Sequence, residues 1–327
     1  MSCSSIGRQL VACLLNISEA RRKDLVETVA RSAIIDKYGN QREGITVLNI
    51  FNDLDYNRSV ITIVASIHLI KEAILSACES ACSLIDMNTH DGIHPCMGAV
   101  DLVPLYPLGE DVGLDDCGKE AQALATALTE RVPGSSAFLF GWADSPQHRA
   151  LALRRKQMGW FRQCHDISII QPDVGPQPNN RYGITGVGAS PYVMNCNVSI
   201  NTQDLALGRY VASALRESSP AGVPGVQVMA LPHEGAVEIA CNVESVCGQS
   251  PLFSSHDKEQ WPSFSIEGHK FYHAPASLIT ARVAELAGQR GVAIKGTALV
   301  GFTPRECKRL AEGAITKSIG EFWRELQ

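Results

Sequence analysis

The sequence has no continuous apolar run of about 18 residues, so it predicts no membrane-spanning helix. It has no basic excess either, with 29 Lys and Arg against 34 Asp and Glu and a net charge of −5. This balance gives no support for nucleic-acid binding and leaves small molecules and proteins as the expected partners. A signal peptide is not expected, because the apolar run at residues 10–15 is short and Arg8 abuts it.

The 11 cysteines include no CxxC pair. Several of them lie within apolar helix or strand patterns, where cysteine behaves as a small core residue. Scattered cysteines of this kind favour free thiols in a reducing compartment, so we expect a cytoplasmic protein. A length of 327 residues suits two domains.

The first half of the chain predicts the element order βαββαβ. An order of this kind closes into a ferredoxin-like layer, an α+β fold with helices on one face of a sheet. Further predicted elements are a helix at 115–131, a strand at 137–140, a basic helix at 145–160 and an edge strand at 167–170. The six elements of the βαββαβ order are expected at residues 8–15, 21–35, 45–51, 58–64, 67–87 and 99–106.

Residues 172–183 contain three prolines and two glycines, which exclude a regular element and predict a boundary. After this segment the βαββαβ pattern restarts. The sequence therefore predicts two α+β domains, residues 1–180 and 181–327. Within the second, residues 248–273 show no apolar period and are expected to form a long excursion. The expected elements there are at 188–200, 203–217, 226–231, 236–243, 275–288 and 292–300, followed by a closing helix at 304–318.

The most informative stretch is residues 85–101, which lies between an apolar helix and an apolar strand. Gly92 and Pro95 interrupt the helix, so His94 is expected on a rigid turn at the start of the strand. The turn is either a functional loop or a polar connection. His90 and His94 have the spacing of helical metal ligands, but the helix is broken and no third ligand is evident, so no metal site is expected.

Five motifs together resemble the formiminotransferase domain family over nearly the whole chain. The resemblance implies two ferredoxin-like subdomains that face each other across a ligand cleft or tunnel. It implies transfer of a formimino group from N-formiminoglutamate, or a related amidine, to tetrahydrofolate as cosubstrate, in a homo-oligomer, expected to be a dimer. The motifs are CLLNISE at 13–19, DLDYNRSVIT at 53–62, GIHPCMGAVD at 92–101, PDVGP at 172–176 and GTALVGFTP at 296–304.

The resemblance also implies roles for individual residues. His94 matches the family's acid/base histidine, because one imidazole can take the proton of the attacking amine and return it to the departing one. Arg58 could bind a substrate carboxylate. Possible catalytic support comes from Asn16, Asp53, Asp55, Asn57 and Arg58, although the two aspartates also suit a turn. The folate-contacting segment maps onto Gly175, Pro176, Gln177, Asn180, Arg181, Tyr182 and Gly183, with Tyr182 placed to stack on a ring.

Four positions depart from the family's pattern, because each lacks a charge that the family usually has. These are Phe51, Ile93, Cys96 and Ser190. The departures leave open a folate-binding protein without transferase activity, or a transferase for a less anionic donor. Cys96 can be interpreted as a reactive nucleophile or as a neutral replacement. The basic run at residues 154–156 predicts a solvated helix face, or a contact for a polyglutamate tail.

Overall fold

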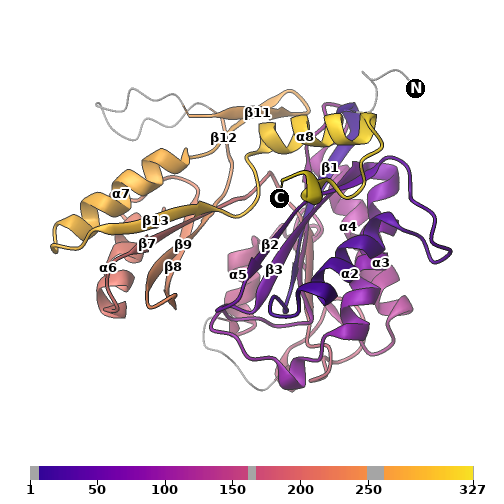
Figure 1. Ribbon diagram of the computed structural model, residues 1–327, viewed down its shortest axis with the longest axis horizontal. Coiled ribbons are helices and arrows are strands. Elements are labelled where there is room, and N and C mark those ends of the chain that lie inside the picture. The colour runs from indigo at the N-terminus through magenta and orange to yellow at the C-terminus, as the bar shows by residue number, and fades with distance from the viewer. Residues whose placement is uncertain (1–6, 161–166, 249–260, 327) are drawn as a thin grey trace. The chain divides into compact units, whose positions relative to one another are not determined.

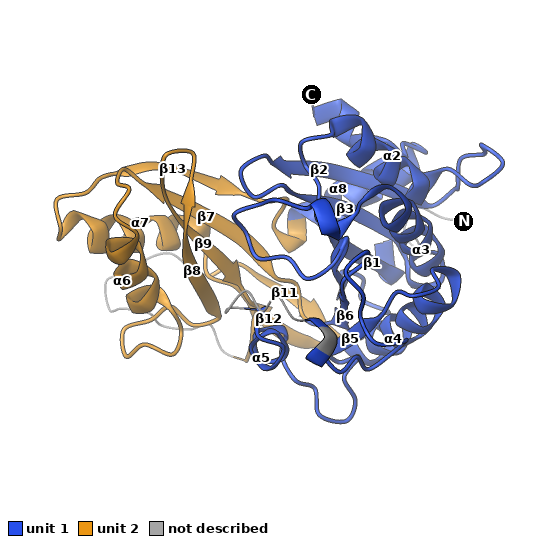
Figure 2. Cartoon of the chain, turned by 90° about the horizontal axis from the view of Figure 1, so that it is seen from below, with its two compact units in different colours: residues 1–190, 306–327 blue, residues 191–305 orange. Residues whose placement is uncertain are grey.

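The computed structural model describes residues 7–160, 167–248 and 261–326 of the chain. The chain divides into two compact units, which Figure 2 colours separately. Unit 1 consists of Met1–Ser190 with Glu306–Gln327, and unit 2 consists of Pro191–Arg305. The sequence predicted a boundary after residue 180, and the compact units divide elsewhere. The predicted boundary concerns the two subdomains that the family resemblance implies, and it stays a prediction.

Unit 1 is built on a six-stranded sheet with the order β2-β3-β1-β4-β6-β5. β1 pairs antiparallel with β3 and β4, whereas β6 pairs in parallel with β4 and β5. The βαββαβ order predicted for the first half is confirmed. The strands are β1 (Leu10–Ile17), β2 (Ile45–Asp53), β3 (Arg58–Ser66), β4 (Val100–Pro107), β5 (Ala137–Gly141) and β6 (Thr185–Ala189). The helices are α2 (Lys23–Ile34), α3 (Ile67–Leu84), α4 (Leu114–Arg131), α5 (Leu151–Gln157) and α8 (Pro304–Thr316).

One apolar core joins this sheet to α2, α3 and α4, which lie along one of its faces (Figure 1). In α3 the buried residues recur every three or four positions, as an amphipathic helix requires. Along β1, Val11, Cys13, Leu15 and Ile17 belong to this core. Because side chains alternate along a strand, Asn16 lies on the opposite face of the sheet.

The opposite face carries a second, smaller apolar cluster. Leu102 of β4 and Phe138 and Phe140 of β5 are buried there. Leu151, the first residue of α5, and Met158, which follows its last residue, pack against them. The short helix α5 therefore covers part of the face on which Asn16 lies.

The C-terminal residues complete unit 1. Val47 N donates a 2.8 Å hydrogen bond to Gly320 O, and Thr46 Oγ1 donates a 2.9 Å bond to Ile319 O. Trp323 is buried in the main core of the unit. The edge strand β2 is thus covered by chain from the far end of the sequence, which protects its backbone groups.

Several predicted elements have different bounds in the structure. β1 extends through Asn16, which pairs in the ladder instead of forming a polar exit. α3 ends at Leu84 rather than Met87, and a 3-10 turn follows it. The basic helix covers only Leu151–Gln157, because Pro146 and a left-handed His148 (φ 49°) precede it. Ile167–Ile169 forms a 3-10 turn, so the predicted edge strand there is wrong.

Unit 2 repeats the element order. Its four-stranded sheet has the order β13-β7-β9-β8, and every pair is antiparallel. These are the fourth, first, third and second strands of the repeat, the same order as β4-β1-β3-β2 in unit 1. The second predicted βαββαβ order is thus confirmed. The elements are β7 (Met194–Ile200), α6 (Leu205–Leu215), β8 (Val226–His233), β9 (Ala236–Val243), α7 (Ala276–Gly288) and β13 (Ile294–Leu299).

The segment predicted as a long excursion contains regular structure. β11 (Ser263–Ile266) and β12 (His269–Tyr272) form a hairpin, and β10 (Val246–Cys247) pairs with β12. Glu267 and Gly268 both have positive φ, at 48° and 80°, as a two-residue hairpin turn requires. The sequence did not predict this hairpin within the excursion, and residues 249–260 lie outside the described residues.

Among the described residues, no helix combines the length and the apolar character needed to cross a bilayer.

Glu244, which follows β9, should make unit 2 less stable as the pH rises. Burial, helped by the negative charge of Glu217, raises the pKa of Glu244 from 4.5 to about 7. Between these values the folded chain binds more protons than the unfolded chain, so stability falls with increasing pH. We expect Glu244→Gln to raise the melting temperature at about pH 8 and to change it little at about pH 4.

Thermal unfolding followed by circular dichroism over this pH range measures the effect. Glu267→Gln, which changes an exposed glutamate of the same unit, is the matched control. An unchanged pH profile in Glu244→Gln would show that Glu244 is not responsible.

Candidate functional site

A β-bulge places a carboxylate on the face opposite α2, α3 and α4. Asn16 pairs with Leu102 and Ile17 pairs with Val100, so Asp101 is an extra residue in β4. A bulge re-aims side chains at the point where it interrupts the ladder. Asp101 is buried there and contacts the side chain of Arg58, from β3.

Asp101 lies between two buried guanidinium groups. Arg58 Nη1 donates to Asp101 Oδ2, and Arg155 Nη2 of α5 donates to the same oxygen at 3.3 Å. Arg58 Nε also donates to Asn16 Oδ1 at 3.1 Å. These three charged side chains therefore carry one positive charge in excess, in a place where water screens charge poorly.

The pKa shifts follow from burial and mutual charge. Burial would raise the pKa of Asp101, but the charges of Arg58 and Arg155 outweigh burial and hold that pKa below its usual value. Burial would lower the pKa of Arg58, but the charge of Asp101 holds it above its usual value. Burial lowers the pKa of Arg155 to about 10, so its guanidinium stays cationic at neutral pH.

His94 lies next to this charged cluster, between aromatic rings. Its ring centroid is 5.2 Å from that of Tyr56 and 5.7 Å from that of Trp160, and the His94 and Trp160 rings form a T-shaped pair. The guanidinium of Arg155 lies 4.5 Å above the Trp160 ring. His94 Nδ1 is 2.9 Å from Pro95 O, which favours the tautomer with the proton on Nδ1 and makes Nε2 the acceptor nitrogen.

Cys96 joins the histidine to the charged cluster. Its Sγ lies 3.5 Å from Arg58 Nη1 and 3.5 Å from the backbone oxygen of His94. Burial would raise the pKa of the Cys96 thiol, but a hydrogen bond with the His94 side chain and the charge of Arg58 lower it overall. The site thus combines a thiol of lowered pKa with a neighbouring imidazole.

The turn between β2 and β3 supports the His94 loop, which is residues 90–99 between the 3-10 turn and β4. Asn57, with φ 47°, accepts from Ala20 N at 3.0 Å and donates to Asp91 O at 3.1 Å. Ile93 N donates to Asp55 O at 3.2 Å. A Cβ at Gly92 would lie 2.3 Å from Tyr56 O, so only glycine fits there. These contacts confirm that the loop is fixed by its surroundings.

The remaining members of the predicted support set have local roles. Asp53 Oδ1 accepts from Tyr56 N at 2.9 Å, which is the turn-forming contact that the sequence suggested.

His90 Nδ1 is 3.1 Å from Ser18 O. In the described part of the chain, no group of three or more His, Cys, Asp or Glu side chains could hold a metal ion.

The predicted folate segment divides into an inner and an outer part. Arg181 donates to the carbonyls of Cys82, Ser83 and Ile85 at the C-terminal end of α3, where cations stabilise a helix. Gly183 pairs with Gly98 next to the His94 loop, and Tyr182 lies partly exposed against the core. The more exposed residues of the segment are Gly175, Pro176, Gln177 and Asn180.

The outer part of the segment packs near the start of β5 rather than beside His94. Ala137 pairs with Val174, and a Cβ at Gly175 (φ 87°) would lie 2.7 Å from Ser135 O. Gln177 Nε2 donates to Ile170 O at 2.6 Å. The structure therefore brings Tyr182 and Gly183 into contact with Ala99 and Gly98 of the His94 loop. Arg181 contacts Ile85 and Met87, which precede that loop.

Sequence reasoning missed Tyr56, Asp101, Arg155 and Trp160 as site residues. Arg154 and Arg155 are buried, so the prediction of a solvated face for the basic run is wrong for both. Arg154 Nε donates to Leu139 O at 2.9 Å and Nη2 pairs with Asp173. One available signal was Asp101 itself, a charged residue at the start of an apolar strand.

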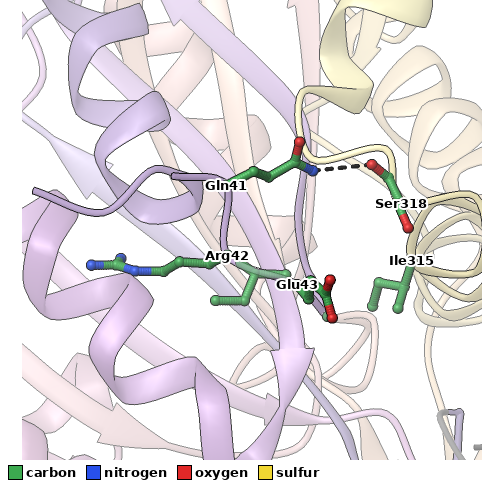
Figure 3. Close-up of a pocket in the computed structure, with 7 residues that line it drawn as sticks. Gln41, Arg42, Glu43, Ile315 and Ser318 are labelled. Atoms are coloured by element: carbon green, nitrogen blue, oxygen red, sulfur yellow. Dashed lines mark hydrogen bonds between the residues drawn. The ribbon is translucent and has the colours of Figure 1, made fainter. Parts of the chain in front are cut away.

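A separate pocket of about 170 Å³ lies at the start of β2 and the end of α8 (Figure 3). Gln41 Nε2 donates to Ser318 O at 3.0 Å across it. The guanidinium of Arg42 points away from Ile315 in Figure 3 and donates to Ser76 Oγ at 2.9 Å. Gln41 and Arg42 thus connect this part of the chain to the residues after α8 and to α3, and none of the predicted site residues lines the pocket.

Comparisons with known proteins agree on one family. A family model described as "Formiminotransferase domain, N-terminal subdomain" matches residues 10–190. The chain is 29% identical to glutamate formimidoyltransferase of Thermoplasma acidophilum over 254 residues, which are 76% of this chain and 80% of that protein. It is 32% identical to a formiminotransferase cyclodeaminase-like protein of Arabidopsis thaliana over 258 residues, 73% of this chain and 83% of that protein.

Asp101→Asn should strongly destabilise unit 1, because it leaves two buried cations without their anion. We expect a loss of about 3–5 kcal/mol in the free energy of unfolding, measured by urea titration. The folded pKa of Asp101 lies below its unfolded value, so its stabilisation is present above the unfolded pKa and is lost as the pH falls through the folded one. The difference between variant and parent should therefore shrink in acid.

Asp111→Asn is the control, since Asp111 pairs with Arg8 at an exposed position and should contribute little. Equal effects of Asp101→Asn and Asp111→Asn would contradict the assigned importance of the buried cluster.

Gly183→Ala should displace the His94 loop. A Cβ at Gly183 (φ 68°) would lie 1.9 Å from Met97 O, whereas one at Gly39 (φ 85°) would meet nothing within 4 Å. Gly39→Ala therefore isolates the backbone strain, about 1–2 kcal/mol. We expect Gly183→Ala to cost clearly more in urea unfolding, and an equal cost would show that the contact with Met97 relaxes freely.

Proposed function

The chain belongs to the formiminotransferase domain family, and on this basis we propose that it transfers a formimino group from N-formiminoglutamate, or a related amidine, to tetrahydrofolate. The observation that carries the proposal is the setting of His94. Its Nδ1 is held by Pro95 O, and its ring lies between two aromatic side chains beside a buried cationic cluster. A formiminotransferase-like function accords with the relatives named glutamate formimidoyltransferase.

His94 performs the proton transfers in this proposal. Its Nε2 takes the proton that the amine loses as it attacks, and it supplies the proton that the departing glutamate nitrogen gains. The contact between Nδ1 and Pro95 O keeps the ring in one orientation during both transfers. Tyr56 and Trp160 pack against the ring.

The excess positive charge favours an anionic donor. Arg58 already donates to Asn16 and Asp101, so it attracts a substrate carboxylate by its charge rather than by a two-pronged contact. Arg155, with Asp101 on one side and Trp160 below it, reinforces the same field. Asn57, Asp53 and Asp55 hold the loop and turn in place.

The folate-binding part of the proposal uses the segment at residues 175–183. Its outer residues, Gly175, Pro176, Gln177 and Asn180, are exposed, and Tyr182 offers a partly exposed ring on which a pterin or aminobenzoyl group can stack. Arg181 and Gly183 position the segment through α3 and the His94 loop.

The finer description of the fold belongs to the same proposal. Each βαββαβ layer would be one ferredoxin-like subdomain, residues 1–180 and 181–327, and the shared strand order supports this. A cytoplasmic location fits the free cysteines of the described residues. The dimeric state and the ligand cleft between subdomains stay predictions.

A second candidate is a folate-binding protein without transferase activity. The observation that favours it is the partner of His94 Nδ1, which is the backbone carbonyl of Pro95 rather than a carboxylate. A carbonyl stabilises an imidazolium less than a charged partner does. The two candidates differ in turnover and agree in folate affinity.

His94→Ala should abolish the reaction. Purified protein is mixed with tetrahydrofolate and N-formiminoglutamate, and 5-formimino- or 5,10-methenyl-tetrahydrofolate is followed by absorbance. Loss of the acid/base group should lower kcat by about 10²–10⁴-fold. His68→Ala, at an exposed position of α3, is the matched control and should keep full activity.

Folate affinity measured by calorimetry separates the remaining cases. Binding of tetrahydrofolate without turnover would favour the folate-binding protein. The absence of both binding and turnover would overturn both candidates.

A further inference from the structure

Cys96 has surroundings unlike those of the cysteines in the apolar cores. Cys13, Cys78 and Cys241 are enclosed by apolar side chains, and burial raises the pKa of each thiol. Cys96 instead lies 3.5 Å from the Arg58 guanidinium, on a loop that is partly open to solvent. It is also a free thiol.

Charge balance favours the thiolate of Cys96. Arg58 and Arg155 share the single carboxylate of Asp101, and one positive charge remains. A thiolate at Cys96, within hydrogen-bond range of Arg58, would be stabilised by this charge, at a site where charges interact strongly. The groups that face the thiol are thus Arg58 from β3, Asp101 from β4, Arg155 from α5 and His94 from its own loop.

His94 supplies an imidazole base in the same loop as the Cys96 thiol. Cys96 follows it by two residues in the same fixed loop, and the Cys96 Sγ lies 3.5 Å from the His94 backbone oxygen. The pKa of the thiol is lowered in part by a hydrogen bond with the His94 side chain, although burial opposes this. A thiol, an adjacent base and a neighbouring cation are the parts of an activated cysteine nucleophile.

We propose that Cys96 is the nucleophile of the transfer and carries the formimino group as a covalent thioimidate between donor and acceptor. The inference rests on the proposed function, since it divides that reaction into two steps. His94 and Cys96 then act together in catalysis, because the imidazole exchanges protons with the sulfur as well as with the two nitrogens.

In the first step His94 takes the proton of the Cys96 thiol, and the sulfur attacks the amidine carbon of N-formiminoglutamate. A C–S bond forms, the C–N bond to glutamate breaks, and His94 gives its proton to the departing nitrogen. In the second step the tetrahydrofolate amine attacks the same carbon and His94 takes the amine proton. The C–S bond then breaks and its electron pair returns to sulfur. His94 gives the amine proton to the sulfur, which restores the thiol, and no group is oxidised or reduced.

The test uses the donor without the acceptor. Full-length protein mixed with N-formiminoglutamate alone should release glutamate in a burst stoichiometric with the protein. Mass spectrometry of peptides from the quenched protein should find one formimino group on Cys96. Direct transfer, in contrast, predicts neither a burst nor an adduct until tetrahydrofolate is added.

Variants test the same point by rate. Cys96→Ala and Cys96→Ser should each lower transfer by about 10²-fold or more, with folding checked by circular dichroism. Cys247→Ala, at an exposed cysteine, is the matched control and should retain the burst and the rate. Full transfer activity in Cys96→Ala, with its loss in His94→Ala, would overturn the proposal and leave the proposed function intact.

The parent protein supplies a measurement that needs no variant. Iodoacetamide labelling, resolved by peptide, should modify Cys96 at a lower pH than Cys247. Labelling of Cys96 only at the same or a higher pH would overturn its role as a thiolate nucleophile. Absence of turnover in the parent protein with both substrates would overturn the proposed function and this inference together.

Discussion

The contact between Arg58 and Asp101 is the interaction on which the candidate site depends. It spans β1, with Asn16 beneath it, and exists because a bulge adds one residue to β4. The same carboxylate accepts from Met97 N at 2.7 Å, which ties the His94 loop to the strand. One buried anion therefore positions a loop backbone, two guanidinium groups and the short helix α5.

This arrangement explains why burial and charge oppose each other throughout the site. Isolated buried charges are costly, and each of these groups is kept ionised by a neighbour on another element. The neighbours come from β3, β4 and α5, which are far apart in sequence. The chemistry of the loop is thus a property of the folded unit rather than of the motif alone.

The order of elements could be predicted because it depends on local patterns. Apolar periods identified α3, β3 and both βαββαβ repeats, and Gly92 with Pro95 correctly indicated a turn at His94. The burial of Arg155 could not be predicted, since its partner Asp101 lies 54 positions away in the sequence. A bulge in β4 turns the Asp101 side chain toward Arg155, and no local pattern indicates that bulge. The β11–β12 hairpin was missed because its strands are short and half-polar. Likewise, nothing local to Arg181 indicates that it binds the carbonyls at the end of α3.

The pairing of Val47 with the chain at Gly320 and Glu321 has a consequence for biosynthesis. Unit 1 is discontinuous, with unit 2 inserted between its two parts. On a ribosome, the first 190 residues would emerge with the edge of β2 uncovered and the place of Trp323 empty. All of unit 2 must be synthesised before these can be filled, so unit 2 can fold before unit 1 is complete. The nascent chain therefore passes through a stage in which the edge of β2 is open to pairing with another chain.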